Sequence, residues 1–474
     1  ACNSTGNGGG IYVQNGNLIF QNSTLALNTA TLSGGGLYIN NAGATATISS
    51  STIAQNNATQ SGAGVAVTNG TVNSRNSIYS NFSADFAGTM NSLGYNLIKN
   101  TAGSTITGTT TGNLLNVEPL LFSLNSNGGY IQTYETNLMS PAIDAGDPSL
   151  TNTTDQRRAR RNTDGNFNGV AGVDIGAFEK QKPSFDFDAE GSSDLAVTRI
   201  VSGTNLSWYA GIRVLNNFQG LLNPTPNGLS VQQFGLSTDI SAPGDYDGDG
   251  QMDAAVYRPS EGIWYNFGST RGFCALRWGI STDLPVPADY DGDGKTDVAV
   301  YRSGVWYILK STQGFTGTIT LGGATDKPVP SDYDGDLKAD VAIYNAGNWT
   351  INRSTGGQTT AQFGLANDVA VPADYNGDGL DNLAVVRPSN GTWYIARPTG
   401  VPAQNFDAFP FGLATDKLVP ADYDGDGKVD IAVWRGNTTS GRGEWYILQS
   451  RDGYFQANFG FSTDKPTANS FIFQ

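Results

Sequence analysis

The sequence predicts an all-β protein, with a parallel β-solenoid in its first part and a β-propeller in its second. Three observations lead to this fold class. The 474 residues favour Gly, Asn, Thr and Ser over the helix formers Glu, Lys and Leu. Glycine clusters recur in the first part of the chain, and an acidic loop recurs six times in the second. Such recurrence of short β-forming runs is typical of solenoids and propellers.

Composition excludes several classes of protein. With no His and a formal net charge of −15, the chain offers neither Ser-His-Asp nor Cys-His catalysis and no His-ligated zinc or haem. Cys2 and Cys274 are too few for a disulfide framework, and we expect two free thiols. The acidic balance argues against a nucleic-acid partner, and no apolar run approaches the ~18 residues of a membrane span. No signal peptide opens the sequence, so we expect any export signal to have been removed or to lie outside it.

Charge is unevenly distributed and marks a domain boundary. Residues 1–180 hold 9 acids and 7 bases, whereas residues 181–474 hold 33 acids and 20 bases. The change falls at Lys180-Gln181-Lys182-Pro183, which is typical of a short linker. We therefore predict two domains, 1–180 and 181–474.

The first domain shows the repeat of a solenoid. Glycine-rich clusters begin at residues 8, 34 and 62, and a second register ends in Asn28, Asn56 and Asn81. Short β-runs between Gly, Asn and Ser corners fit one coil per repeat, with backbone pairing between coils. The alternative, a disordered low-complexity tract, would not need apolar pairs in register.

These coils resemble the right-handed parallel β-helix of bacterial surface proteins. The segments that follow resemble the C-terminal part of bacterial choice-of-anchor Q proteins in five phrases: SLGYNLI (92–98), NGG (127–129), SPAIDAG (140–146), TDQR (154–157) and DIGAFE (174–179). Arg158 departs from that pattern, because Gly usually follows Asp-Gln-Arg. The resemblance implies a right-handed parallel β-helix over 1–180, with a cap over about 113–180 that hides its last coil.

Some β-helices degrade polysaccharides, so the carboxylates of the first domain matter. Glycoside hydrolysis needs two carboxyl groups about 5–9.5 Å apart. Residues 8–84 contain no Asp or Glu, and Arg75 is their only base. We therefore predict no catalytic residues and no enzymatic activity. In the cap, we expect a structural ion-pair network of Asp155, Arg157, Arg158 and Asp174.

The second domain repeats an acidic loop with the pattern Asp-x-Asp-x-Asp-Gly-x-x-Asp. Alternating acids place three side chains on one side of a tight turn, and glycine permits the positive φ that the turn needs. The seventh residue would add a backbone carbonyl and the ninth a further carboxylate. Such hard oxygens suit Ca²⁺, which takes 6–8 oxygen ligands at about 2.3–2.6 Å. A solvated acidic turn is the alternative, but four carboxylates in one turn would repel one another without a cation.

The predicted ligands lie in six loops and imply five to six Ca²⁺ sites. Those acting through side chains are Asp186, Asp188, Glu190 and Asp194; Asp245, Asp247, Asp249 and Asp253; Asp289, Asp291, Asp293 and Asp297; Asp332, Asp334, Asp336 and Asp340; Asp374, Asn376, Asp378 and Asn382; and Asp422, Asp424, Asp426 and Asp430. Those acting through the backbone carbonyl are Gln251, Lys295, Lys338, Leu380 and Lys428. These loops hold 23 of the 42 acidic residues, so more than half of the acidic residues belong to the predicted metal sites.

Each loop begins a repeat with the length of a propeller blade. A β-run follows the loop, then a Trp, then a Phe-Gly or similar step, with an Asp four residues after that Gly. These repeats resemble the FG-GAP/VCBS family, whose Ca²⁺-loop β-propellers occur in integrin heads and many bacterial surface proteins. Six copies imply six blades over 181–474, although integrin-type relatives have seven. We expect the Trp side chains to pack between blades, and residues 466–472 to close the ring by pairing near 183–187.

Together these features predict an exported, non-enzymatic bacterial surface protein with a structural or adhesive role. Its Ca²⁺-stabilised propeller, presented on the β-helix, would bind a glycan or protein on a cell or matrix surface. A second hypothesis is a subunit that assembles into an extracellular filament or surface lattice through an open β-helix end. A third is a polysaccharide-active enzyme.

Overall fold

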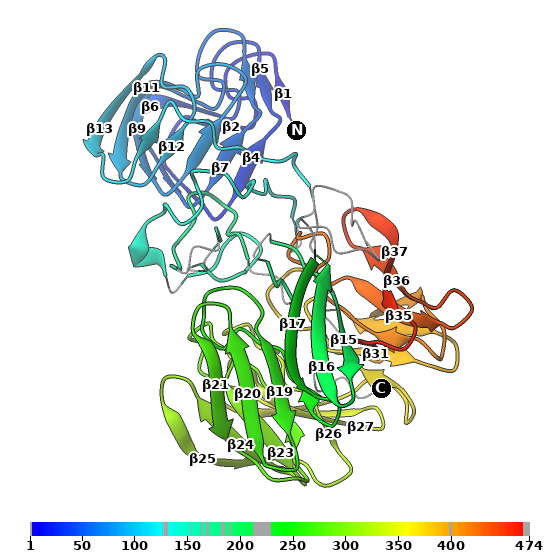
Figure 1. The fold of residues 1–474 in the computed structure, drawn as a ribbon. Helices are drawn as coiled ribbons and strands as arrows, with labels where there is room; N and C mark the ends of the chain where they lie inside the picture. The colour runs from blue at the N-terminus through cyan, green and yellow to red at the C-terminus, as the bar shows by residue number, and fades with distance from the viewer. Residues whose placement is uncertain are drawn as a thin grey trace. The chain divides into compact units, whose positions relative to one another are not determined.

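The computed structural model describes residues 2–125, 127, 131–151, 153–161, 163, 165–166, 170–181, 185–188, 191–211, 229–397 and 401–467. The chain divides into two compact units, residues 1–181 and 182–474 (Figure 1). Within the described residues every element is a β-strand except the 3₁₀ turn η1 (Pro148–Leu150), so the all-β prediction is confirmed. None of the described segments forms a helix long and apolar enough to span a membrane.

The first unit contains three parallel sheets, which the chain visits in turn (Figure 1). The first sheet consists of β1 (Asn3–Ser4), β5 (Thr29–Ala30) and β8 (Asn57–Ala58). The second consists of β2 (Ile11–Val13), β3 (Asn17–Gln21), β6 (Leu37–Ser49), β9 (Val65–Arg75), β11 (Phe86–Leu93) and β13 (Ser104–Thr109). The third consists of β4 (Thr24–Ala26), β7 (Thr52–Ala54), β10 (Ile78–Ser80), β12 (Leu97–Ile98) and β14 (Leu114–Leu115).

Successive coils of this unit stack in parallel register. In the third sheet the aligned residues are Thr24, Thr52, Ile78, Leu97 and Leu114. The first three belong to the repeats visible in the sequence, whereas the coils that contain the last two are shorter and lie outside that repeat. Inward-facing aliphatic and aromatic side chains of the second and third sheets, among them Ile39, Ile48, Ile53, Tyr79 and Phe86, form the interior.

A buried ladder of side-chain amides runs along one corner of the coils. The Nδ2 group of Asn28 donates to Oδ1 of Asn56 at 3.0 Å, and Nδ2 of Asn56 donates to Oδ1 of Asn81 at 3.0 Å. The ladder ends at Asp85, whose Oδ1 accepts from Asn81 Nδ2 at 2.9 Å. Each amide thereby satisfies a neighbour one coil away, which explains why Asn recurs once per coil.

The predicted cap does not simply cover the last coil. Ala142 and Ile175 pack on Ile78 and Leu97 of the third sheet. The amide of Ala177 donates to the hydroxyl of Thr52 at 3.1 Å, so this segment also reaches the second coil. Ala142, Ile175 and Ala177 therefore lie along a side of the stacked coils, where they shield the third sheet.

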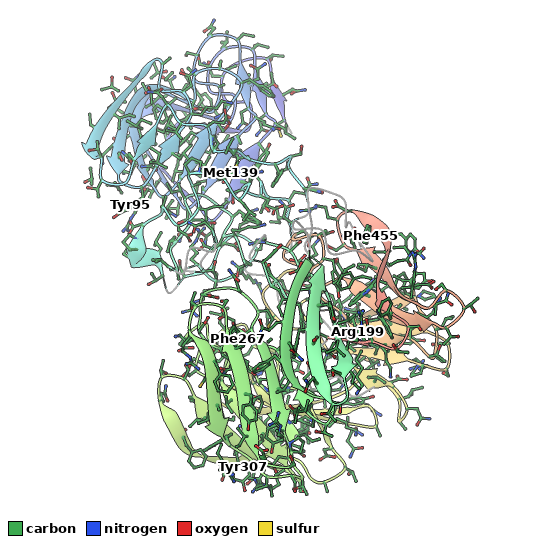
Figure 2. The ribbon with its side chains drawn as sticks, viewed as in Figure 1. Tyr95, Met139, Arg199, Phe267, Tyr307 and Phe455 are labelled. Atoms are coloured by element: carbon green, nitrogen blue, oxygen red, sulfur yellow. The ribbon has the colours of Figure 1, made fainter. Side chains whose placement is uncertain are left out.

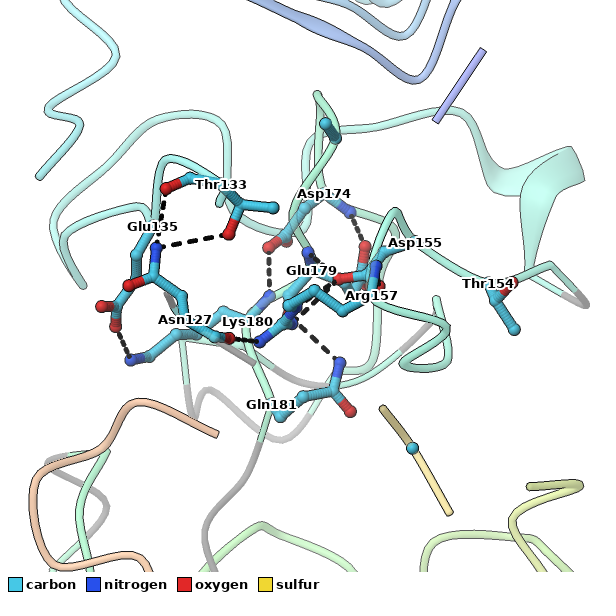
Figure 3. Close-up of polar contacts among 12 residues, drawn as sticks. Asn127, Thr133, Glu135, Thr154, Asp155, Arg157, Asp174, Glu179, Lys180 and Gln181 are labelled. Atoms are coloured by element: carbon cyan, nitrogen blue, oxygen red, sulfur yellow. Dashed lines mark hydrogen bonds and ion pairs between the residues drawn. The ribbon is translucent and has the colours of Figure 1, made fainter. Parts of the chain in front are cut away.

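A buried polar network holds this segment together (Figure 3). Arg157 forms an ion pair with Asp155 at 2.9 Å and donates to the carbonyls of Asn127 and Glu179 at 2.9 and 2.5 Å. Lys180 pairs with Glu135 at 2.7 Å. The Asp174 carboxylate accepts from the backbone amides of Asp144 and Lys180 at 2.8 and 2.7 Å.

The predicted membership of this network is wrong for Arg158. This side chain is exposed, and its backbone has a φ of 83°. Glycine adopts such a left-handed conformation with least strain, which is a physical reason for a glycine at this position. Conversely, the sequence interpretation misses Glu135, Glu179 and Lys180, which are buried in the network.

The second unit is a β-propeller of six four-stranded antiparallel sheets, so six blades are confirmed over seven (Figure 1). Blade 1 contains β15 (Leu195–Ser202), β16 (Asn205–Gly211), β17 (Leu229–Leu236) and β38 (Lys465–Pro466); blade 2 contains β18 (Ile240–Ser241), β19 (Ala254–Arg258), β20 (Ile263–Gly268) and β21 (Gly272–Arg277); blade 3 contains β22 (Leu284–Pro285), β23 (Val298–Arg302), β24 (Val305–Lys310) and β25 (Gly314–Thr320). Blade 4 contains β26 (Lys327–Pro328), β27 (Val341–Asn345), β28 (Asn348–Asn352) and β29 (Gln358–Gln362); blade 5 contains β30 (Val369–Ala370), β31 (Ala384–Arg387), β32 (Thr392–Ala396) and β33 (Phe406–Pro410); blade 6 contains β34 (Lys417–Leu418), β35 (Ile431–Asn437), β36 (Arg442–Gln449) and β37 (Gly453–Phe461).

The C-terminal strand closes the ring, but with a partner other than the predicted one. β38 pairs with β15 through Val197 opposite Pro466 and Thr198 opposite Lys465. For Pro466 the partner is therefore Val197 and not a residue near 183–187, and in blade 1 β38 takes the place that the short strand before the loop takes in blades 2 to 6. Residues 183–184 and 468–472 lie outside the described residues.

In each blade the Trp side chain forms a hydrogen bond with the backbone of the Phe-Gly step. Each Trp indole donates from Nε1 to the carbonyl oxygen of the residue just before the Gly, as in Trp306 to Leu321 at 3.2 Å and Trp349 to Phe363 at 2.8 Å. The six indoles are all buried. The predicted packing role of these Trp residues is therefore confirmed.

The Asp that follows each Phe-Gly step forms an ion pair in five of the six blades. Its partner is an Arg near the end of the strand after the loop, as in Arg258 with Asp239 at 2.8 Å. The same Arg lies over a Tyr ring, 4.5 Å from Arg258 to Tyr265. In blade 4 the Arg and Tyr are replaced by Asn345 and Thr350.

Candidate metal centres

The acidic loops occupy equivalent places around the propeller. In blades 2 to 6 each loop connects the short first strand to the second strand, and in blade 1 the loop precedes β15. In blades 2 to 6 the ninth residue forms a β-bridge with the residue just before the loop, as in Ala288 with Asp297. This bridge brings both ends of the loop together and closes the turn.

The first aspartate of each loop shapes the turn. The carboxylate of Asp289 accepts from the backbone amides of Gly292 and Gly294 at 2.6 and 2.8 Å. Both glycines have positive φ, 78° and 85°, which glycine adopts without strain. In the fourth loop Leu337 replaces the second glycine and carries a φ of 73°, so the turn is kept despite that substitution.

The aspartate at the third position of the loop carries the clearest mark of a cation site. In four loops one of its carboxylate oxygens is buried and has no hydrogen-bond partner; these atoms are Oδ1 of Asp247, Asp291, Asp334 and Asp424. The other oxygen is held from outside the loop, as when Asp247 Oδ2 accepts from the Thr270 hydroxyl at 2.9 Å. A buried, unpaired carboxylate oxygen is costly in free energy. Its recurrence at one position fits a bound cation better than it fits a solvated turn.

The aspartate at the ninth position of the loop joins the loop to a neighbouring hairpin. Asp297 accepts from the backbone amide of Tyr290 at 2.8 Å and from that of Ser311 at 2.6 Å. The same contacts recur at Asp253, Asp340 and Asp430. Sequence interpretation misses the supporting serines, although Ser-Thr before a hairpin glycine at 269–270, 311–312 and 354–355 is a repeated signal.

Five of the six predicted loops gather three carboxylates with ligand oxygens within 4.8 Å of one another. The groups are Asp186, Asp188 and Asp194; Asp245, Asp247 and Asp249; Asp289, Asp291 and Asp297; Asp332, Asp334 and Asp336; and Asp422, Asp424 and Asp430. Glu190 lies outside the described residues. The fifth loop is different, because Asn376 and Asn382 leave it two carboxylates at ligand positions, Asp374 and Asp378.

Burial and mutual repulsion raise the pKa of several of these carboxyl groups. Burial is the main cause for Asp297, whose pKa rises to about 7, with Asp291 and Asp289 adding repulsion. Burial and neighbouring carboxylates act in the same direction on Asp430, whose pKa rises to about 9. A divalent cation among these groups would favour their ionised forms. The donor set therefore fits Ca²⁺ in the four loops that contain an unpaired carboxylate oxygen. The first loop adds a fifth cluster of three carboxylates.

Backbone hydrogen bonds link the six loops in a closed ring. The amide of the eighth residue of each loop donates to the carbonyl of the first residue of the preceding loop, as in Thr296 to Asp245 and Ala339 to Asp289, both at 2.7 Å. The remaining pairs are Asp381 to Asp332, Val429 to Asp374, Ser193 to Asp422 and Met252 to Asp186. Each loop is therefore tied to two others.

Fold and site together define a six-bladed propeller with acidic loops between the first two strands of its blades. Residues 374–433 match the FG-GAP-like repeat family, so the FG-GAP resemblance is confirmed for this part of the chain. The resemblance of residues 1–180 to choice-of-anchor Q proteins stays a prediction. No curated protein matches the chain.

Solved structures with partial likeness include three proteins of different kinds. A lectin from Agrocybe aegerita that recognises non-reducing terminal N-acetylglucosamine is 15% identical, with a TM-score of 0.36, over 61% of this chain and 85% of that one. Virginiamycin B lyase from Staphylococcus aureus is 8% identical, with a TM-score of 0.34, over 56% and 84%. The V. cholerae biofilm matrix protein Bap1 is 17% identical, with a TM-score of 0.23, over 49% and 40%. At these scores the likeness does not extend to function.

Proposed function

We propose that this chain is a non-enzymatic, extracellular surface protein of bacterial origin, in which Ca²⁺ stabilises a ligand-binding propeller. The observation that carries the proposal is the buried, unpaired Oδ1 atom of Asp247, Asp291, Asp334 and Asp424, found at the same position in four of the six loops. Outside the cell Ca²⁺ is abundant enough to fill sites with dissociation constants of about 10⁻⁴–10⁻³ M. An extracellular location therefore suits a protein with five such loops.

In this proposal the first unit is a right-handed parallel β-helix. Its support is the cyclic visit to three parallel sheets and the stacking of five aligned positions in the third sheet. The unit presents the propeller at a surface, and the propeller contacts a glycan or a protein there. The Ca²⁺ ions have a structural role, held by carboxylates of the loops and by the backbone carbonyl of each seventh residue.

The metal part of the proposal is tested by counting bound Ca²⁺ calorimetrically. Wild-type protein is expected to bind about five ions, and Asp291→Asn is expected to lower that number by one. Asp407→Asn is the matched control, because Asp407 belongs to none of the six loops and pairs with Arg397 on the exposed surface at 2.6 Å. An equal Ca²⁺ number in wild type and Asp291→Asn would contradict the assignment.

The adhesive part is tested separately with a glycan array and with cell-binding assays. We expect binding in millimolar Ca²⁺ that is lost in a chelator. Protein that is folded and Ca²⁺-loaded but binds neither glycans nor cells would contradict the adhesive role and leave the metal sites intact.

A further inference from the structure

A cavity of about 340 Å³ lies between blades 5 and 6 of the propeller. Its apolar walls come from both blades and include Val369, Val386, Phe411, Leu413, Leu418 and Val433. Leu413 at its rim is 57% exposed, so the cavity opens to solvent. For scale, an apolar cavity of about 150 Å³ is enough to hold benzene.

The other blades show what occupies the equivalent place. The position of Val386, the fourth residue after the loop, is Tyr257, Tyr301 and Tyr344 in blades 2, 3 and 4, whereas blades 6 and 1 carry Trp434 and Thr198. The three tyrosines are buried. Each ring therefore takes up volume at the junction with the next blade: the equivalent cavity beside Tyr344, between blades 4 and 5, measures about 240 Å³, whereas valine at 386 leaves about 340 Å³.

The tyrosine hydroxyls also show which polar group lies at these junctions. Tyr257 donates to the carbonyl of Ile280 at 2.6 Å, and Tyr344 donates to that of Leu365 at 2.9 Å. Both carbonyls belong to the residue just after the Gly of the Phe-Gly step. Leu413 holds this position beside the cavity.

The carbonyl of Leu413 accepts one hydrogen bond that the equivalent carbonyls of the other blades also accept. It accepts the amide of Asp416 at 3.1 Å, as Leu365 accepts that of Asp368 at 3.1 Å. A carbonyl oxygen has two lone pairs, and the tyrosine hydroxyl uses the second one in blades 2 to 4. Val386 has no hydroxyl to donate.

We propose that this cavity is a binding site for a small phenol. The ring would occupy the volume that tyrosine fills at the three other junctions, and its hydroxyl would donate to the carbonyl of Leu413. Apolar walls with one well-placed acceptor are the usual composition of a small-ligand site. The ligand is a free phenol or a terminal phenolic ring of a larger molecule.

Binding of phenol itself to the full, Ca²⁺-loaded chain tests the proposal by ligand-observed NMR and calorimetry. We expect saturable binding of one phenol, with benzene about fivefold weaker because it cannot make the hydrogen bond. Val386→Tyr fills the cavity with the chain's own phenol and should weaken binding at least tenfold. Val386→Phe serves the same purpose if the tyrosine variant does not fold.

A converse variant sharpens the test. Tyr344→Val recreates the same vacancy beside Leu365 at the junction of blades 4 and 5, and should raise the stoichiometry from one phenol to two. Equal phenol affinity in wild type and both Val386 variants would overturn the proposal, as would the absence of saturable binding to wild type. A hydroquinone monoglycoside, which keeps one free phenolic hydroxyl, then distinguishes the two ligand sources, because it binds only if a larger molecule can present its ring.

Discussion

Arg199 and Asp464, 265 residues apart, form a two-point ion pair that joins the first and last blades. The guanidinium donates from Nε to Oδ1 at 2.7 Å and from Nη2 to Oδ2 at 2.6 Å. Arg199 lies on β15 (Figure 2), and Asp464 is fully buried immediately before β38. The four other copies of this ion pair join residues that are 19 apart in the sequence, so the pair across the closure is the fifth copy of the same contact.

Removing Arg199 should open the ring more easily than removing an exposed arginine. Arg199→Ala leaves the buried Asp464 carboxylate without its cation, which we expect to lower the free energy of unfolding by about 3 kcal/mol. Arg397→Ala is the control, since its partner Asp407 is exposed and such pairs contribute about 0–1 kcal/mol. Urea unfolding of the two variants measures the difference, and equal losses would contradict a closure role.

Chelation of Ca²⁺ should destabilise the propeller much more than the first unit. An ion present at 100 times its dissociation constant adds about 2.7 kcal/mol to the folded state. Differential scanning calorimetry with and without a chelator should show a clear fall of the propeller transition. Readdition of Ca²⁺ should restore it, whereas Mg²⁺ should not, because Mg²⁺ retains more of its water. A propeller transition whose temperature changes neither with the chelator nor on readdition of Ca²⁺ would count against the metal sites.

Asn376→Asp should strengthen metal binding by the fifth loop. Its new carboxylate joins those of Asp374 and Asp378, whereas the amide Nδ2 of Asn376 is buried without a partner in the wild type. We expect one additional Ca²⁺ by calorimetry. Asn390→Asp makes the same charge change at an exposed position outside the loops and should leave the stoichiometry unchanged. An unchanged Ca²⁺ number in Asn376→Asp would show that charge is not what limits this loop.

Loss of one rung of the amide ladder should destabilise the first unit alone. Asn56→Ala removes the acceptor of both the backbone amide and the side chain of Asn28, each at 3.0 Å. Because buried donors would be left without partners, we expect a loss of about 2–4 kcal/mol. Asn57→Ala, at the exposed neighbouring position, should cost far less. Thermal unfolding followed by domain-resolved calorimetry compares them, and a shift of the propeller transition instead would contradict this account.

Much of the propeller could be predicted from the sequence because its signals are local and repeated. The loop with Asp289, Asp291 and Asp297 contains its own turn geometry, and the spacing of the Trp and Phe-Gly steps reports the blade length. Six copies therefore predict six blades. The cap was less predictable, because Glu135 and Lys180 are 45 residues apart in the sequence and meet only through the fold.

The sequence by itself determined the β class, the blade repeat and the acidic residue types, since these depend on short-range patterns of side chains and turns. Tertiary structure alone decided which carboxylate oxygens are left unpaired, that β38 rather than a local strand completes blade 1, and that the cavity beside Val386 is larger than the one beside Tyr344. Each of these depends on which distant segments pack together. Hydrogen-bond partners and packing volume belong to that assembly and to no single repeat.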